Sequence, residues 1–87
     1  MLPSRLPGAA KRDLFVQVRS ALSAAGRFVM GDVVVPDDPD DAVTPLSEGY
    51  DHPSSLLELS GWLADAGFRA AITWQWKDIA VFSCDPR

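Results

Sequence analysis

The sequence is short of the features that mark secreted and membrane proteins. Cys84 is the single cysteine, so an internal disulfide is impossible and a reducing, cytoplasmic location is expected. No apolar run approaches the roughly 20 residues that a membrane-spanning helix needs. The basic residues Arg5, Lys11 and Arg12 near the N-terminus have no long apolar stretch behind them, so no signal peptide is expected. These absences predict a cytoplasmic protein without a membrane partner.

Basic residues are missing from the middle of the chain. Residues 28–68 contain no lysine or arginine and nine acidic residues, whereas residues 1–27 contain five basic residues and one acidic residue. An acidic middle repels phosphate, so nucleic acid is not an expected partner. The basic start could attract an acidic partner, although a solvated helix face is the more ordinary interpretation.

Sequence motifs for common cofactors and metals are also absent. None of the six glycines stands in a Gly-x-Gly-x-x-Gly or P-loop pattern. Asp37 and Glu48 occupy positions 1 and 12 of a possible EF-hand loop, but Pro39 and Ala42 stand where a ligand and a glycine are required. One histidine and one cysteine cannot build a zinc site within a single chain. We therefore predict no metal site and no cofactor-binding residue in this chain.

The first half of the chain predicts a helix, a strand and a long loop. Apolar residues recur at helical spacing over residues 9–25, and Gly26 is predicted to end this helix in the left-handed conformation. The apolar, valine-rich run 27–35 is typical of a strand buried on both faces. Gly31 inside it suggests a bulge or a close backbone approach. Residues 36–53 then form a long acidic loop, of the kind that is often functional.

A second helix is predicted over residues 54–66. Ser55 and Glu58 have the Ser-x-x-Glu spacing of a capping box, in which each side chain satisfies a backbone N–H group at the start of the helix. Gly67 fits the left-handed residue that commonly ends a helix.

The C-terminal part predicts two antiparallel strands, residues 70–76 and 79–84, joined by a two-residue turn. Alternation along the first strand places three large apolar residues on one face: Ile72, Trp74 and Trp76. Together the elements predict one small α/β domain over residues 1–87. Its order is helix, strand, helix, strand, strand, and its three-stranded mixed sheet ends in an antiparallel hairpin.

Four segments resemble class I S-adenosylmethionine-dependent methyltransferases of the small-molecule type: residues 6–15, 26–36, 62–68 and 74–81. In that family they look like the helix before the fifth strand, the fifth strand, the helix behind it, and the sixth and seventh strands. The resemblance covers nearly the whole chain. It implies the C-terminal half of a Rossmann-like fold, without the first four strands.

The cofactor-binding half of that family has no counterpart in this sequence. S-adenosylmethionine is therefore implied by the family only, and the isolated chain is expected to be inactive. The resemblance implies an acceptor-substrate-side segment of a methyltransferase that acts on a small molecule. The alternative is a non-catalytic remnant that serves as a dimerisation or protein-interaction module. By family analogy the last strand lies between the other two, so strand 27–35 keeps an open edge that would pair with a second copy or with a separate chain that supplies the missing half.

Ligands of open α/β sheets bind beyond the carboxyl ends of the parallel strands, which points to five candidate substrate-binding residues: Asp32, Val33, Tyr50, His52 and Trp76. Asp32 and His52 are the catalytic candidates, because a general base could only be the single histidine or a carboxylate. Ordinary structural roles compete with these assignments. Asp32 could hydrogen-bond to the backbone, His52 could be solvated, and Trp76 could pack under the second helix.

Overall fold

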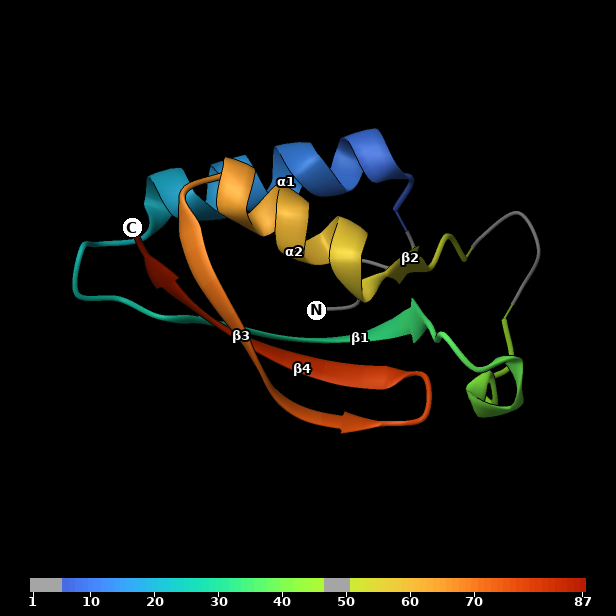
Figure 1. Ribbon diagram of the computed structural model, residues 1–87. Helices are drawn as coiled ribbons and strands as arrows, with labels where there is room; N and C mark the ends of the chain where they lie inside the picture. The colour runs from blue at the N-terminus through green and yellow to red at the C-terminus, as the bar shows by residue number, and fades with distance from the viewer. Residues whose placement is uncertain (1–5, 47–50) are drawn as a thin grey trace.

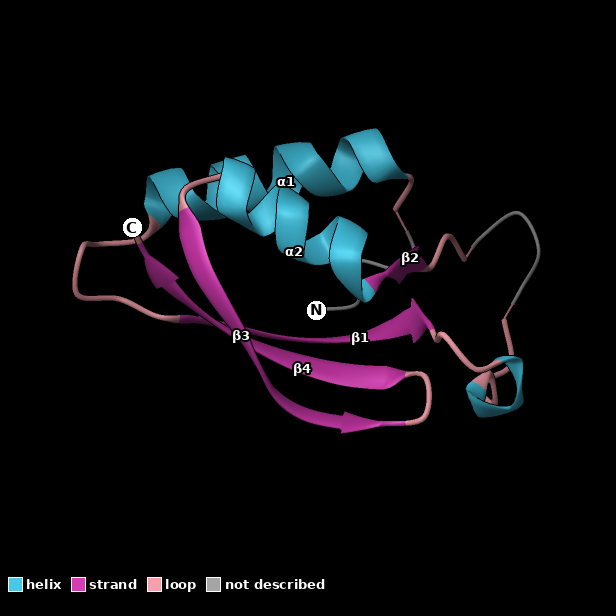
Figure 2. Ribbon diagram, viewed as in Figure 1, coloured by secondary structure: helices cyan, strands magenta, loops and turns pink. Residues whose placement is uncertain are grey.

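The computed structural model describes residues 6–46 and 51–87, which form a sheet with both helices on one face (Figure 1). The elements are α1 (Gly8–Ala21), β1 (Phe28–Val35), the short 3₁₀ helix η2 (Pro39–Asp41), β2 (Ser54–Ser55), α2 (Leu56–Asp65), β3 (Phe68–Trp76) and β4 (Ile79–Pro86). Figure 2 shows the resulting two layers, helices above and strands below. Within the described ranges, neither helix has the length and apolar character needed to cross a membrane.

The sheet has four strands in the order β2-β1-β4-β3, which corrects the expectation of three. The additional strand, β2, runs parallel to β1 and pairs Ser54 with Val34 and Ser55 with Val35. A two-residue strand is too short to show an alternating pattern, so the sequence contains no signal for it. The other pairs are antiparallel, and β4 lies between β1 and β3 as expected, which makes the sheet mixed.

The first helix ends earlier than its apolar pattern suggests. It stops at Ala21 rather than Ala25, and Leu22 already has an extended backbone. Gly26 instead closes a turn, in which its N–H donates to the carbonyl of Ser23 at 3.0 Å. Among the described glycines only Gly67 has a positive φ, so the left-handed cap predicted at Gly26 is wrong. A short turn-rich connection replaces the last helical turn and leads the chain into β1.

The predicted start and end of the second helix are confirmed in their local chemistry. Ser55 Oγ accepts from the N–H of Glu58, and the Glu58 carboxylate accepts from the N–H of Ser55, both at 3.1 Å. This capping box fixes the start of α2 beside the end of β1. Gly67 follows α2 with a φ of 99°, a value that glycine adopts at little cost.

A bulge in β3, not in β1, controls which side chains face the helices. The register between β1 and β4 runs without interruption through Gly31, and an added Cβ there would meet only Val81 Cγ2 at 4.0 Å. The bulge and close approach predicted at Gly31 are therefore both wrong. In β3 the register shifts between Ile72 and Trp74. Residues after such a bulge change face, so Trp74 pairs with Val81 on the face opposite the helices.

The expected shared face of Ile72, Trp74 and Trp76 is thus split by the bulge. Ile72 pairs with Phe82, which faces the helices, whereas Trp76 pairs with Ile79 on the other face. Both tryptophans are 52% exposed, so neither packs under α2.

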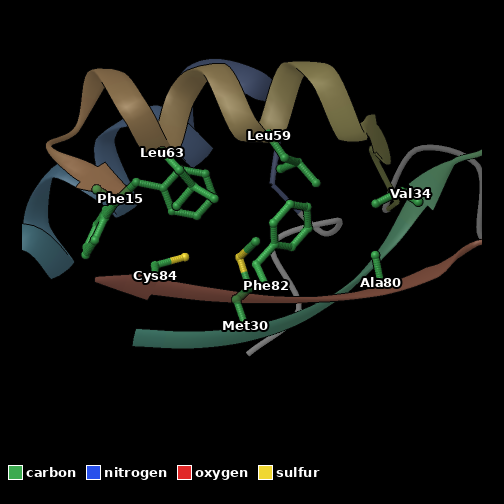
Figure 3. Close-up of a cluster of buried hydrophobic side chains, with 9 residues drawn as sticks. Phe15, Met30, Val34, Leu59, Leu63, Ala80, Phe82 and Cys84 are labelled. Carbon is green, nitrogen blue, oxygen red and sulfur yellow. The ribbon is translucent and has the colours of Figure 1, made fainter. Parts of the chain in front are cut away.

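The core lies between the helices and the inner face of the sheet (Figure 3). Its buried members come from α1, α2 and all three long strands: Phe15, Met30, Val34, Leu59, Leu63, Phe68, Ala80, Phe82 and Cys84. Alternate residues of β1 and β4 supply most of them, because successive side chains of a strand point to opposite faces.

Candidate functional site

The candidate site lies where the parallel strands β1 and β2 end and α2 begins. A cavity of about 480 Å³ opens there. It carries one carboxylate, Asp37, and its other lining residues are Val35, Ser55, Leu56, Leu57, Ser60 and Gln75. The carboxyl ends of parallel strands, next to the start of a helix, are the usual ligand position in an open α/β sheet. Hydroxyl, amide and apolar groups on its wall suit a small, partly apolar molecule.

A buried lysine lies in the same corner of the fold, because it contacts Ser54, the residue before the cavity-lining Ser55. Lys11 of α1 has no exposed surface, and its ammonium donates to Ser54 Oγ at 2.7 Å and to the carbonyl of His52. Burial lowers the pKa of Lys11 below its ordinary value, and the negative charges of Asp32 and Glu58 oppose that shift. The lysine thereby joins α1, the end of the long loop and β2.

Asp32 is a buried carboxylate that interacts electrostatically with the ammonium group of Lys11. It lies on the helix-facing side of β1, only 1% exposed, and its Oδ1 accepts from the N–H of Val33 at 2.9 Å. It does not line the cavity. A buried aspartate that interacts with a buried lysine balances charge inside the fold. The geometry therefore supports the structural interpretation of Asp32 that competed with the catalytic one.

The structure separates the other candidate residues. His52 is exposed, and the contact it makes with Lys11 uses its backbone carbonyl rather than its imidazole. Val33 and Trp76 lie in one register row across the sheet, on the face opposite the helices. Tyr50 lies outside the described residues. The four described candidates thus do not form one cluster: Asp32 and His52 both lie near Lys11, whereas Val33 and Trp76 share the other face.

The sequence did not predict the buried role of Lys11, because this lysine belongs to the basic N-terminal part, for which a solvated helix face is the ordinary interpretation. Its spacing contained a usable signal. Lys11 stands four residues before Phe15, which is itself fully buried, so both project from one face of α1. The sequence did not predict that Lys11 contacts Ser54 of β2 and interacts with Asp32 of β1, because these residues are far apart along the chain.

A second buried carboxylate, Asp78, holds the long loop against the β3–β4 turn. Its two oxygens accept from the N–H and the hydroxyl of Thr44, each at 2.8 Å. Burial alone would raise the pKa of Asp78, but the Thr44 hydrogen bonds, with those from the N–H groups of Asp78 and Val43, lower it overall. This anchor fixes the end of the acidic segment relative to the sheet.

The described residues do not fit S-adenosylmethionine as its complete binding site. The cavity has no glycine-rich turn, and its single carboxylate, Asp37, follows the strand directly in an exposed loop. Cys84 is not a reactive nucleophile, because burial raises the pKa of its thiol to about 11. No group of three or more potential metal ligands occurs within residues 6–46 and 51–87.

The sequence matches no known protein family and no curated protein. Solved structures do resemble it. The S-adenosylmethionine-dependent methyltransferase SibL, in its apo form, superposes with a TM-score of 0.68 at 17% sequence identity. The alignment covers 97% of this chain and 28% of that protein, so the chain spans little more than a quarter of its structural neighbour. The fold of this chain is methyltransferase-like.

Proposed function

We propose that this chain is the acceptor-substrate side of an S-adenosylmethionine-dependent methyltransferase that acts on a small molecule. The observation that carries the proposal is the cavity of about 480 Å³ at the ends of β1 and β2, in a fold that superposes on 28% of a methyltransferase. The lining of the cavity, which does not fit S-adenosylmethionine as a complete site, is consistent with this role. The chain supplies a wall for the acceptor, and a partner half supplies the cofactor; alone it transfers no methyl group.

In this role the chain contributes binding and orientation. Ser55, Ser60 and Gln75 offer polar groups that can orient an acceptor, and Leu56 and Leu57 can shield it from water. Holding an acceptor in a reactive orientation is itself a large part of catalysis in two-substrate reactions. Lys11 acts at a distance from the cavity, because it fixes Ser54 and hence the start of α2.

The proposal has two experimental arms. Calorimetric titration of S-adenosylmethionine into the isolated chain should show no saturable binding, and a measurable affinity would refute the location of the cofactor site in a separate half. Small phenols, amines and aromatic acids, titrated into isotope-labelled chain, should shift the amide signals of Ser55, Leu57, Ser60 and Gln75. Ser60→Phe should abolish these shifts by filling the cavity, whereas Val16→Phe on the exposed face of α1 should not. Shifts that are scattered over the surface would contradict an acceptor site.

We also propose the second candidate function, a dimerisation or interaction module, because most of one edge of β1 has no strand partner among the described residues. Among the described residues, pairing on this side of β1 is confined to Val34 and Val35. The remaining edge, from Phe28 to Val33, presents backbone groups that a second copy or a separate chain can pair with. Hydrogen exchange tests this role. Edge amides of β1 should become protected as concentration rises or a partner is added, and unchanged rapid exchange would contradict it.

A further inference from the structure

The face of the sheet that points away from both helices is apolar and is not used by the proposed function. We call it the outer face. It consists of three register rows across β1, β4 and β3: Val29, Ser83 and Ala71; Gly31, Val81 and Trp74; Val33, Ile79 and Trp76. None of these nine residues is charged. In Figure 1 both helices lie on the opposite side of the sheet, so no described helix covers these rows.

The outer face exposes large side chains. Trp74 and Trp76 are each 52% exposed, and Val29 is 60% exposed. These exposed side chains lie in adjacent register rows and so form one continuous apolar patch. Contiguous exposed apolar patches commonly mark sites where another protein binds.

The two ends of the outer face have opposite charge. At the start of β1, Arg27 pairs with Asp85 at 2.9 Å, and Arg69 is the register partner of the same aspartate. That end therefore has two arginines and one aspartate, a net positive charge. At the other end of β1, four aspartates follow the strand: Asp37, Asp38, Asp40 and Asp41. Figure 1 shows η2, which carries two of them, at the far end of the sheet from the C-terminus.

We propose that the outer face binds a second copy of this chain, with a two-fold axis that runs across the strands. This arrangement lays the apolar rows of the two sheets on one another. It also places the start of β1 of each copy over the end of β1 of the other, so each basic end meets an acidic segment. A surface that complements itself under a two-fold rotation is what a symmetric dimer requires. Asp37 belongs both to this acidic segment and to the lining of the cavity. The proposal still does not rest on the methyltransferase assignment, because the dimer needs neither an acceptor nor a cofactor.

The first test measures the dimer dissociation constant by sedimentation equilibrium for the wild type and two lysine variants. Val29→Lys places a charge in the outer face and should weaken the dimer by at least about tenfold. Val16→Lys, a matched change at a valine that is 52% exposed on α1, should leave the constant unchanged. Thermal unfolding of both variants checks that the fold is intact. A wild type that stays monomeric at its highest soluble concentration, or an equal effect of both variants, would overturn the proposal.

A charge exchange tests the arrangement of the two copies. Arg27→Glu should weaken the dimer, because the acidic segment of the second copy would then meet a carboxylate. Adding Asp40→Arg in the same chain should restore much of the affinity, since both contacts of the two-fold arrangement are then reversed together. A double variant that dimerises as weakly as Arg27→Glu alone would overturn the antiparallel arrangement.

Discussion

At the scale of single residues, two buried charged side chains connect parts of the chain that are far apart in sequence. Lys11 of α1 donates to Ser54 and interacts with Asp32, and Asp78 accepts from Thr44. Burial removes both charged groups from water at a cost in free energy, and partners across the fold offset that cost. They hold two points of the long loop, Thr44 and His52, against the rest of the fold.

Removing the buried lysine should strongly destabilise the fold. Lys11→Met should cost about 3 kcal/mol of unfolding free energy, because the buried carboxylate of Asp32 loses its cationic neighbour. Adding Asp32→Asn should recover a large part of that loss, since the variant pair then buries no net charge. Urea unfolding of the single and double variants measures the coupling. Lys77→Met, at an exposed lysine, is the control, and a double variant less stable than Lys11→Met would contradict the coupling.

The anchor at Asp78 should make stability depend on pH in the acidic range. The pKa of Asp78 is lowered in the folded state, so its contribution is present above the ordinary value of 3.8 and is lost as the pH falls through the lower, folded value. At neutral pH, Asp78→Asn should cost about 1–2 kcal/mol, because hydrogen bonds to a charged acceptor are replaced by weaker ones. The difference between wild type and variant should shrink as the pH falls below 3.8. A difference in unfolding free energy that stays constant with pH would contradict the role of the Asp78 carboxylate in this pH dependence.

At the scale of elements, the turn between β3 and β4 contains a local conflict. Lys77 occupies the first turn position with a φ of 53°, a conformation that favours glycine. Its ammonium lies 5.4 Å from the centroid of the Trp76 ring, which offsets part of that cost. The hairpin therefore forms with a residue that its turn does not favour, held by the long strand pairing on either side.

Replacing this lysine by glycine should stabilise the protein. Lys77→Gly should raise the unfolding free energy by about 0.5 kcal/mol. Glycine removes the cost of a left-handed backbone at this position, and the lost contact of the lysine with Trp76 cancels part of that gain. Lys77→Ala is the matched control, because it loses the same contact and keeps the unfavourable backbone conformation. Thermal unfolding should rank glycine above wild type and alanine below it. The reverse order of the two variants would contradict the assignment of strain to this residue.

At the scale of the whole molecule, one layer of helices covers one face of the sheet. All the buried apolar residues of the described part of the chain lie between these two layers, and no described helix covers the outer face. A two-layer domain of 87 residues has a small core, so each buried side chain carries a large share of its stability. This dependence can be measured at the centre of the core.

Truncation of Phe82 should abolish much of the stability of the fold. The side chain is fully buried on the central strand β4, between the sheet and α2 (Figure 3). Phe82→Ala should cost about 3–5 kcal/mol, a large part of the total for a small domain. Loss of the cooperative thermal transition, or a large fall in its midpoint, is the expected result. Val16→Ala at an exposed position should have little effect, and a similar effect of both changes would contradict this location of the core.

The sequence by itself determined the features whose partners are close along the chain. The capping box joins Ser55 to Glu58, and Gly67 ends the same helix, so short spacing was sufficient to predict both. The apolar patterns predicted both helices and the three long strands, although the first helix ends four residues early. Local propensity and periodicity specify elements because the interacting groups lie within one turn or one strand.

The tertiary structure alone decided the features that depend on distant partners. The two-residue strand β2 exists because Ser54 and Ser55 return beside β1, and Lys11 becomes buried because α1 crosses the site where that strand begins. The bulge in β3 turned Trp74 and Trp76 away from the helices and created the outer face. A one-residue shift moves every later side chain to the opposite face, and only the pairing with β4 determines where that shift occurs.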